Sequence, residues 1–366
     1  MPRRTATMLA STLCLIALLC AAVLIRVPYA EMSPGPTYNT LGKVDGKQVL
    51  SFPGRKIPHR AYGGHLNMTT VRVTGSEYRM DLFTALHGWL SDDEAVVPHE
   101  VLYPDDASAE EVDQRNAEEF SQSQESAKAA ALEELGEPVT ARVVVQAVVA
   151  DAPSEGRLNA GDVIRTVDGE RVREPEEVAR VVTRHEPGER VRFGIVPAER
   201  VKAAQKKGRD VGSLPVEQVT VPTEKAPDGR AIVGIQPGVS HTLPFPIDIS
   251  LADVGGPSAG LMFALGIVDK LTPQDRLTGG AFVAGTGTID ASGRVGPIGG
   301  IGMKTIAAHD KGAEYFLTPA KNCSAAASHK PDGLTLVRVK SLGEALQELE
   351  KIREGDTADL STCPAD

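Results

Sequence analysis

The sequence predicts an α/β (α+β) protein with a second, small β-rich domain, both placed behind one N-terminal transmembrane helix. Three observations predict this class. An uncharged apolar run covers residues 8–25, and a stretch rich in β-branched residues and short turns begins near residue 139. From residue 231 to 350, strand-like and helix-like segments alternate, which is typical of a mixed α/β arrangement. The 366 residues are enough for two or three hydrophobic cores.

The apolar run at 8–25 has the length of a membrane span, because 18 residues of helix reach about 27 Å. A cleaved signal peptide is the alternative, but its apolar part is normally about 7–15 residues long and a small-residue cleavage site follows it. The segment PYA at 28–30 fits such a site poorly. We therefore expect an uncleaved anchor that contacts the lipid bilayer.

Charges beside this run predict its orientation. Arg3 and Arg4 precede it, whereas only Arg26 follows it directly. Because positive charge concentrates on the cytoplasmic side, residues 1–7 are expected in the cytoplasm and the rest of the chain outside.

The segment 31–136 follows the anchor and opens with a Pro/Gly-rich connector. HLNMTTVRV, at 65–73, alternates as a half-buried strand does. The segment 110–136 reads as a long helix, with Gly136 as its stop.

The β-rich domain is expected at 137–222. Its run GRLNAGDVIRTVDGERV, Gly156 to Val172, gives a turn, a strand and a DG hairpin in the order of a PDZ domain, which it resembles. Such modules bind a peptide or a C-terminus as an added strand. Another small β-rich domain is the alternative, and no loop for a terminal carboxylate is identifiable. The charged stretch 202–231 is expected to form a hairpin excursion and an exit linker.

A third domain is expected at 228–352, before a tail at 353–366. Its predicted strands cover 244–251, 280–290, 313–319 and 334–340, and its predicted helices cover 258–271, 301–312 and 341–352.

The four cysteines divide by position. Cys14 and Cys20 lie in the anchor as small apolar residues. Cys323 and Cys363 lie in the external part, where an oxidising compartment would permit a disulfide that fixes the tail. Two free thiols are the alternative.

Composition excludes several function classes. The formal net charge is −10 and no long basic run occurs, so no nucleic-acid partner is expected. Neither C-x-x-C nor H-E-x-x-H is present, so we expect no metal site, and no cofactor is predicted.

The segment GPSAG, residues 256–260, presents a serine before an apolar helix pattern. Ser258 could be a helix cap, since serine is favoured there. It could also be a nucleophile, because the unpaired N–H groups and positive dipole of a helix start are suited to an oxyanion hole.

Two bases compete for the proton of that serine. The string also satisfies G-x-S-x-G, the nucleophile elbow of α/β-hydrolases, which would need an acid, Asp275 or Asp290, and a histidine, His309 or His329. However, ADVGG separates the preceding strand from the serine.

The other base is a lysine. Lys304 has Ile301, Met303 and Ile306 around it in a helical pattern. An apolar setting lowers the pKa of a lysine, and a neutral lysine can deprotonate a serine. A helical lysine more often extends to water, and spacing alone does not separate Lys304 from Lys311.

The segments 255–273, 277–290 and 293–319 together resemble the proteolytic domain of Lon-type proteases. That resemblance implies that Ser258 is the nucleophile and Lys304 its base. It also implies that Thr278, read as the threonine of a T-G step, positions the lysine. Backbone groups of Gly256, Pro257 and Ala259 would then hold the oxyanion.

The order of anchor, PDZ domain and Lon-type domain is similar to the membrane-anchored, PDZ-containing Lon-like proteases of bacteria (the YlbL family). The strand segment GGHLNMTTV, 63–71, and the 117–135 helix resemble the first part of the protease fold, which would place the PDZ domain as an insertion. A homo-oligomer in a bacterial cell membrane is also implied by this resemblance.

Two departures from ATP-driven Lon stand out. The chain has no G-x-x-x-x-G-K-[ST]; the string GIGMKT, 300–305, has Met303 where glycine is required, so no nucleotide is expected. The acid usual three residues before the serine is replaced by Gly255, and Asp253 is the nearest acid.

The expected function is therefore ATP-independent endopeptidase activity on polypeptides outside the membrane, with a Ser–Lys dyad and a PDZ domain that recruits or gates substrates. The alternatives are a catalytically weak PDZ scaffold for peptides and a Ser-His-Asp hydrolase.

Overall fold

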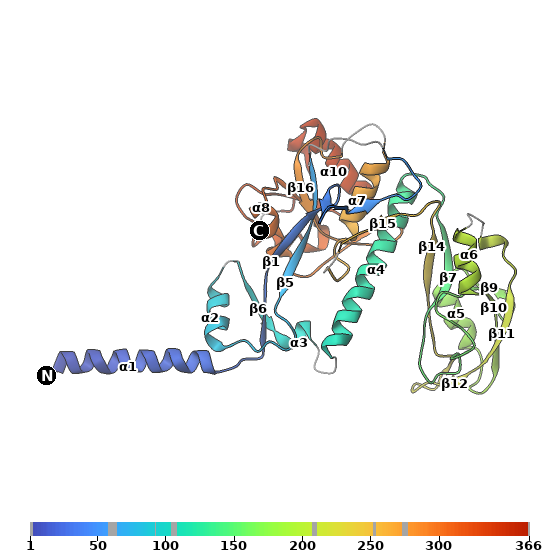
Figure 1. Ribbon diagram of the computed structural model, residues 1–366, viewed down its shortest axis with the longest axis horizontal. Helices are drawn as coiled ribbons and strands as arrows, with labels where there is room; N and C mark the ends of the chain where they lie inside the picture. The colour runs from blue at the N-terminus through green and yellow to red at the C-terminus, as the bar shows by residue number, and fades with distance from the viewer. Residues whose placement is uncertain are drawn as a thin grey trace. The chain divides into compact units, whose positions relative to one another are not determined.

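The computed structural model describes residues 3–57, 64–91, 93–103, 108–206, 211–251, 254–272 and 277–364. The chain forms two compact units. The first combines Met1–Glu137 with Phe245–Asp366, and the second is Pro138–Pro244. The second unit thus interrupts the first in the sequence (Figure 1).

The N-terminal helix α1 covers Arg3–Leu24. Its window Thr7–Leu24 has a mean hydropathy of 2.4 and is not buried in the protein, so it fits a single-pass membrane anchor. The chain then enters β1, where Tyr29 and Ala30 pair with β6. Cleavage after Ala30 would therefore remove the start of a paired strand.

A six-stranded sheet organises the first unit in the order β20-β19-β16-β5-β1-β6. Four neighbouring strands, β20, β19, β16 and β5, are parallel, while β1 is antiparallel to β5 and β6. The strand bounds are β1 Tyr29–Asn39, β5 His65–Val73, β6 Ala95–Pro98, β16 Phe282–Gly285, β19 Tyr315–Pro319 and β20 Thr335–Val339. The segments on either side of the second unit therefore complete one sheet, which is the α/β (α+β) class predicted from the sequence.

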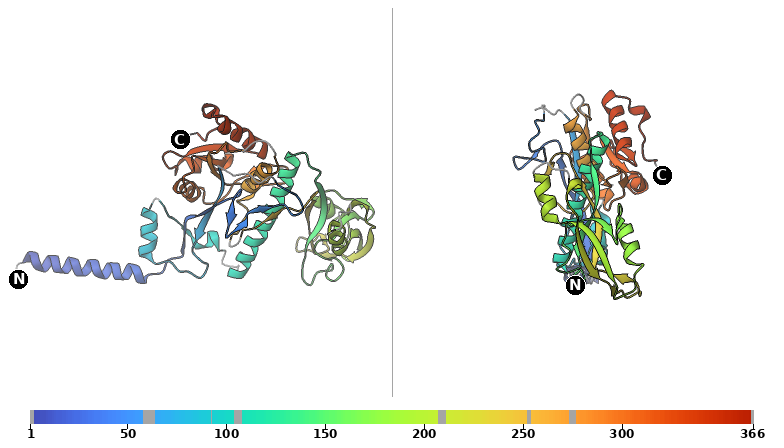
Figure 2. Two further views of the ribbon diagram at one scale, coloured as in Figure 1. Left: turned by 45° about the horizontal axis from the view of Figure 1, so that its top comes forward. Right: turned by 90° about the vertical axis from the view of Figure 1, so that its right-hand side faces the viewer.

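Helices flank this sheet (Figure 2). Their bounds are α2 Leu82–Leu90, α3 His99–Leu102, α4 Ala109–Glu134, α7 Gly260–Leu271, α8 Ile301–Asp310, α9 Cys323–Ala327 and α10 Leu342–Glu354. Short strands complete the unit: β2 Lys43–Val44, β3 Lys47–Gln48, β4 Leu50–Ser51, β15 Asp248–Ile249, β17 Thr288–Ile289 and β18 Val295–Gly296.

Two of these helices fix the segment that carries Ser258. Helix α4 starts at a capping box between Ser108 and Glu111, which satisfies its first N–H groups. It packs on α7, where the rings of Phe120 and Phe263 meet with centroids 5.9 Å apart. Helix α7 is apolar and buried from Gly260 to Lys270, so it cannot shift without opening the core.

The C-terminal tail is attached to the sheet. Cys323 and Cys363 form a disulfide, the pairing considered from the sequence. The Arg338 N–H donates to Ser361 O at 2.7 Å, and the Cys363 N–H donates to Leu336 O at 3.1 Å. The tail therefore lies along the edge of β20.

The second unit contains the sheet β11-β10-β8-β7-β14, with β9 paired to β8. Its elements are β7 Thr140–Val148, β8 Val163–Val167, β9 Glu170–Arg171, α5 Pro175–Val182, β10 Arg190–Val196, α6 Ala198–Lys206, β11 Glu217–Pro222, β12 Glu224–Lys225, β13 Ala231–Ile232 and β14 Ile235–Thr242. Its core consists of Val143, Val145, Leu158, Ile164, Val167, Val172, Val178, Val181, Val182, Val191, Phe193, Ile195, Val221 and Val233.

The extent of this unit differs from the sequence-based boundaries of 137–222 and 228–352. Strand β14 pairs with β7 from Ile235↔Val148 to Thr242↔Thr140, so the unit continues to Pro244. The stretch expected as an excursion and linker contributes most of α6 and the edge strand β11. The first and last strands of the unit are neighbours, which is the geometry that an inserted domain requires.

Candidate active site

Ser258 lies in the turn that leads into α7, and α4 fixes this turn from one side. Gly256 has a φ of +79°, which only glycine adopts readily. The Gly256 N–H donates to Asn116 O at 2.9 Å, and the buried Ser123 hydroxyl donates to Pro257 O at 2.9 Å. The turn is thus tied to a helix from a distant part of the sequence.

The segment after β16 holds the turn from the other side. The Ser258 carbonyl oxygen accepts from the Gly287 N–H at 2.8 Å and from the Thr286 hydroxyl at 3.0 Å. Strand β16 is parallel to its neighbours, and its carboxyl end is where open α/β sheets form binding sites.

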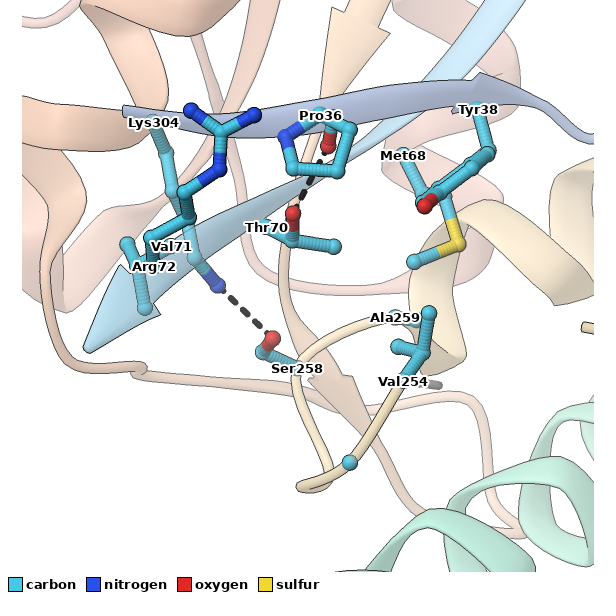
Figure 3. A pocket seen from close by; sticks show the side chains of 11 residues that line it. Pro36, Tyr38, Met68, Thr70, Val71, Arg72, Val254, Ser258, Ala259 and Lys304 are labelled. Carbon is cyan, nitrogen blue, oxygen red and sulfur yellow. Dashed lines mark hydrogen bonds between the residues drawn. The ribbon is translucent and has the colours of Figure 1, made fainter. Parts of the chain in front are cut away.

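Lys304 reaches the serine from the first turn of α8. Gly300 directly precedes that helix, and its φ of 66° turns the chain into it. Lys304 Nζ lies 2.7 Å from Ser258 Oγ and 3.2 Å from Thr286 Oγ1. Figure 3 shows the lysine and serine side chains pointing toward one another.

Lys304 is almost completely buried from solvent. Its exposed fraction is 2%, and this burial lowers the pKa of the ammonium group from 10.5 to about 7. A large fraction is therefore neutral at neutral pH. A neutral Nζ has a lone pair that can accept the proton of Ser258.

Thr286 orients that lone pair. Its hydroxyl proton is directed to Ser258 O, which leaves its oxygen free to accept from Lys304. One N–H of the amine therefore points at Thr286, and the amine can direct its lone pair at Ser258 Oγ.

A pocket with a volume of about 320 Å³ adjoins the pair (Figure 3). It is lined by Pro36 and Tyr38 of β1, Met68, Thr70, Val71 and Arg72 of β5, and Val254, Gly255, Ser258, Ala259 and Lys304. The pocket therefore presents the serine and lysine to a molecule lying against β1 and β5.

The prediction that Thr278 positions the lysine is wrong. Thr278 is buried before β16, where its Oγ1 accepts from the Gly280 N–H at 3.4 Å, whereas Thr286 directly follows the same strand. The two threonines thus lie at opposite ends of β16, and Lys304 bonds to the second. A second T-G pair, Thr286–Gly287, was the signal in the sequence that identifies the right residue.

The predicted oxyanion groups are only partly suited to that role. Pro257 has no N–H, and the Gly256 N–H is occupied by Asn116. Within the described part of the chain, the N–H groups of Ser258 and Ala259 donate to no backbone oxygen. These two amides are therefore the donors that remain.

Gly255 stands where ATP-driven Lon usually has an acid, and α4 packs closely against this glycine. A Cβ on Gly255 would lie 3.0 Å from the Asn116 Cβ, closer than side chains normally pack. Helix α4 therefore leaves little room for a Cβ at position 255. Asp253 lies outside the described residues.

The histidines of the hydrolase alternative lie elsewhere. His309 is exposed and 3.5 Å from Asp310, and His329 hydrogen-bonds to Ser328 at 3.3 Å. Neither is a partner of Ser258 among the residues that the structure describes. Asp275 lies outside those residues, and Asp290 is paired with Arg294.

No metal centre is visible among the described residues, since no three His, Cys, Asp or Glu side chains there are grouped to hold an ion.

Two family models match the chain. The PDZ domain model covers residues 119–204, and the model of the Lon protease (S16) C-terminal proteolytic domain covers residues 252–350. The second match contains Ser258, Thr286 and Lys304.

Curated relatives match the same region. Lon protease 2 of Bacillus subtilis (strain 168) is 37% identical over 98 residues, which is 26% of this chain and 17% of the relative. Lon protease of Buchnera aphidicola subsp. Schizaphis graminum is 36% identical over 95 residues, which is 25% of this chain and 12% of the relative. The chain thus spans less than a fifth of either relative.

Solved structures of PDZ domains also match. The PDZ domain of the SdrC-like protein from Listeria innocua is 23% identical, covers 26% of this chain and 90% of its own, and has a TM-score of 0.20. The corresponding domain from Listeria monocytogenes is 22% identical, with coverages of 26% and 84% and a TM-score of 0.20. The two family models and the Lon relatives indicate that the chain carries a PDZ domain and the proteolytic domain of a Lon-type serine peptidase, a combination that fits a PDZ-containing Lon-like protease.

Proposed function

We propose that the protein is an ATP-independent endopeptidase that cleaves polypeptides through a Ser258–Lys304 dyad. One observation carries the proposal: a serine hydroxyl and a lysine amine lie 2.7 Å apart, and the lysine is 2% exposed. A buried lysine with a pKa near 7 is a suitable general base at neutral pH.

The reaction would proceed in two halves. Neutral Lys304 accepts the proton of Ser258 as Oγ attacks the carbonyl carbon of the peptide bond. The resulting ammonium returns this proton to the departing amine, and an acyl-serine remains. Lys304, neutral again, takes a proton from water as this water attacks the carbonyl carbon of the ester. The ammonium then gives that proton to Ser258 Oγ as the ester bond breaks, which releases the acid product and restores the serine hydroxyl and the neutral lysine.

The negative oxygen of each tetrahedral intermediate needs fixed donors. We assign this role to the N–H groups of Ser258 and Ala259 at the start of α7, where the positive end of the helix dipole adds to the stabilisation. Thr286 is a positioning residue, because it contacts the lysine and the serine backbone.

The position of the GIGMKT segment in the fold supports the proposed independence from ATP. Its lysine lies in α8 and points at Ser258, so it is not part of a phosphate-binding loop. We propose that this chain cleaves its substrates without a nucleotide.

The remaining parts would bring substrates to the site. We propose that the PDZ domain binds a peptide segment or C-terminus of the substrate and thereby recruits or gates it. Helix α1 would keep the N-terminus in the cytoplasm and both compact units outside, as the arginines at 3 and 4 predict. By resemblance to Lon-type domains, copies of the chain would assemble as a homo-oligomer.

A catalytically weak peptide-binding scaffold is the rival proposal. A scaffold gains nothing from a dehydrated lysine beside a serine, because burying an amine costs free energy. The dyad geometry therefore favours the enzyme.

The direct test is cleavage of casein by the full chain in detergent, without nucleotide, compared with Ser258→Ala and Lys304→Met. We expect cleavage by the unsubstituted protein, loss in both variants, and full activity in His309→Ala, which changes an exposed histidine outside the dyad. Equal background rates in the unsubstituted protein and both dyad variants would mean that the scaffold proposal is right.

A further inference from the structure

A cluster of exposed apolar side chains lies on one face of α2. Phe83 is 47% exposed, Leu86 45%, Trp89 52% and Leu90 87%. At 100° per residue these four positions form one continuous stripe, while Ala85 and Gly88 on the opposite side are buried. The helix therefore packs on the unit with its small residues and presents its large ones outward.

This helix is tied to the end of the membrane span. The Leu82 N–H donates to Ile25 O at 2.9 Å, and the Val27 N–H donates to Met80 O at 2.9 Å. Arg26 Nη1 lies 3.7 Å from Asp81 Oδ2, the side chain that also caps α2. The apolar window of α1 ends at Leu24, so α2 starts beside the residue that follows it (Figure 1).

These contacts limit what can cover the stripe. If α1 crosses a bilayer, Ile25 and Arg26 lie where the hydrocarbon region ends, and α2 is bonded to them directly. A helix is about 10–12 Å wide, so its outward face cannot be far from the lipid headgroups. The membrane that α1 crosses is therefore the surface already adjacent to the stripe.

The chemistry of the stripe agrees with a position at the lipid surface. Tryptophan and tyrosine concentrate at membrane–water interfaces. Trp89 contacts Tyr29 edge to face, with ring centroids 5.3 Å apart, at the start of β1. Arg26 is exposed beside them and is suited to lipid phosphate. An amphipathic helix at this place buries its apolar face at the headgroup boundary.

We propose that α2 is a second membrane contact, in which Phe83, Leu86, Trp89 and Leu90 insert into the outer surface of the bilayer beside α1. The contact would hold the first compact unit against the lipid, so that the unit does not swing freely on the anchor. A second copy of the chain on this face is the competing occupant that the test must distinguish.

Trp89 is the only tryptophan of the chain, so its fluorescence reports on this face without a label. The full chain is reconstituted in phosphatidylcholine nanodiscs, with acyl chains brominated either close to the headgroup or near the bilayer centre. We expect blue-shifted Trp89 emission that the shallow bromines quench about twofold more strongly than the deep ones. Leu86→Ser with Leu90→Ser should reduce this quenching, whereas Val149→Ser, which changes a 56% exposed valine of the other unit, should leave it unchanged.

Either of two results would overturn the proposal. Water-like Trp89 emission that neither bromolipid quenches would show an uncovered face. Blue-shifted emission that bromolipids do not quench, and that reverts when the chain is diluted to one copy per nanodisc, would assign the face to a second copy. Melting curves from circular dichroism verify that the serine variants remain folded.

Discussion

The burial of Lys304, on which the catalytic proposal depends, also lowers the stability of the folded protein. In the unfolded chain its pKa would be near 10.5, whereas burial lowers it to about 7 in the fold. As the pH falls from 10.5 to 7, the unfolded state binds a proton that the folded state does not, so folding stability decreases. Below pH 7 both states are protonated and the loss is constant.

Lys304→Met should therefore stabilise the protein. We expect a gain in the free energy of unfolding on the order of 4 kcal/mol at and below pH 7, which shrinks toward zero as the pH approaches 10.5. Denaturant unfolding of the two proteins across this range measures it. A gain that does not depend on pH would mean that the lysine is not neutral in the folded state.

Thr286→Val removes the hydroxyl that orients the lysine while keeping the shape of the side chain. Because Thr286 acts on the dyad and does not line the pocket, kcat should fall roughly tenfold while KM stays close to its original value. Thr286→Ser should restore much of the rate. Thr288→Val, two residues further on, is the control. An equal loss of kcat in Thr288→Val would mean that the effect of Thr286→Val comes from altered packing and not from the lost hydroxyl.

Ser258 and Lys304 could be proposed as a pair from the sequence because both lie in motifs with fixed neighbours, and the structure places their side chains 2.7 Å apart. The threonine was misidentified from the sequence, since two T-G pairs occur eight residues apart and only the end of β16 decides between them. The close approach of Asn116 to position 255 results from packing between distant segments, which no local pattern contains.

At the scale of elements, α4 fastens the serine turn through Ser123. Ser123→Ala removes one hydrogen bond to Pro257 O, which is worth about 1 kcal/mol. The turn should then hold Ser258 less firmly, and casein cleavage should slow several-fold with a small loss of stability. Ser121→Ala changes an exposed serine of the same helix, so an equal effect there would contradict this role.

Elements with a strong period were predictable, and those without one were not. The alternating strand predicted at 65–73 matches β5 residue for residue. The segment 244–251, expected as a strand, forms only the two-residue β15, because few of its residues find a partner strand. Helix α2 escaped prediction because its apolar stripe faces outward and its length is only nine residues.

At the scale of the molecule, the second unit enters and leaves through the paired strands β7 and β14. Joining Glu137 to Phe245 by a short Gly/Ser linker should therefore leave the first unit folded. If the PDZ domain recruits substrates, this deletion should retain cleavage of short peptides and lose most cleavage of casein. Unchanged casein cleavage would show that the PDZ domain does not recruit this substrate.

The order of the domains was predictable because each part has its own sequence pattern. These patterns are an apolar run, a β-branched stretch with short turns, and alternating strand-like and helix-like segments. The boundary near residue 222 was not predictable, since β14 belongs to the second unit through pairing with β7, some ninety residues earlier in the chain. Long-range pairing of this kind leaves no local signal.

The central claim is that a buried, neutral Lys304 activates Ser258. Initial rates of casein cleavage by the full chain, measured from about pH 5 to about pH 10, test it most directly. The rate should rise with pH and reach half of its maximum near pH 7, where Lys304 loses its proton, and Lys304→Arg should be inactive throughout. Activity that persists in Lys304→Arg, or a rate that first rises near pH 10, would contradict the dyad.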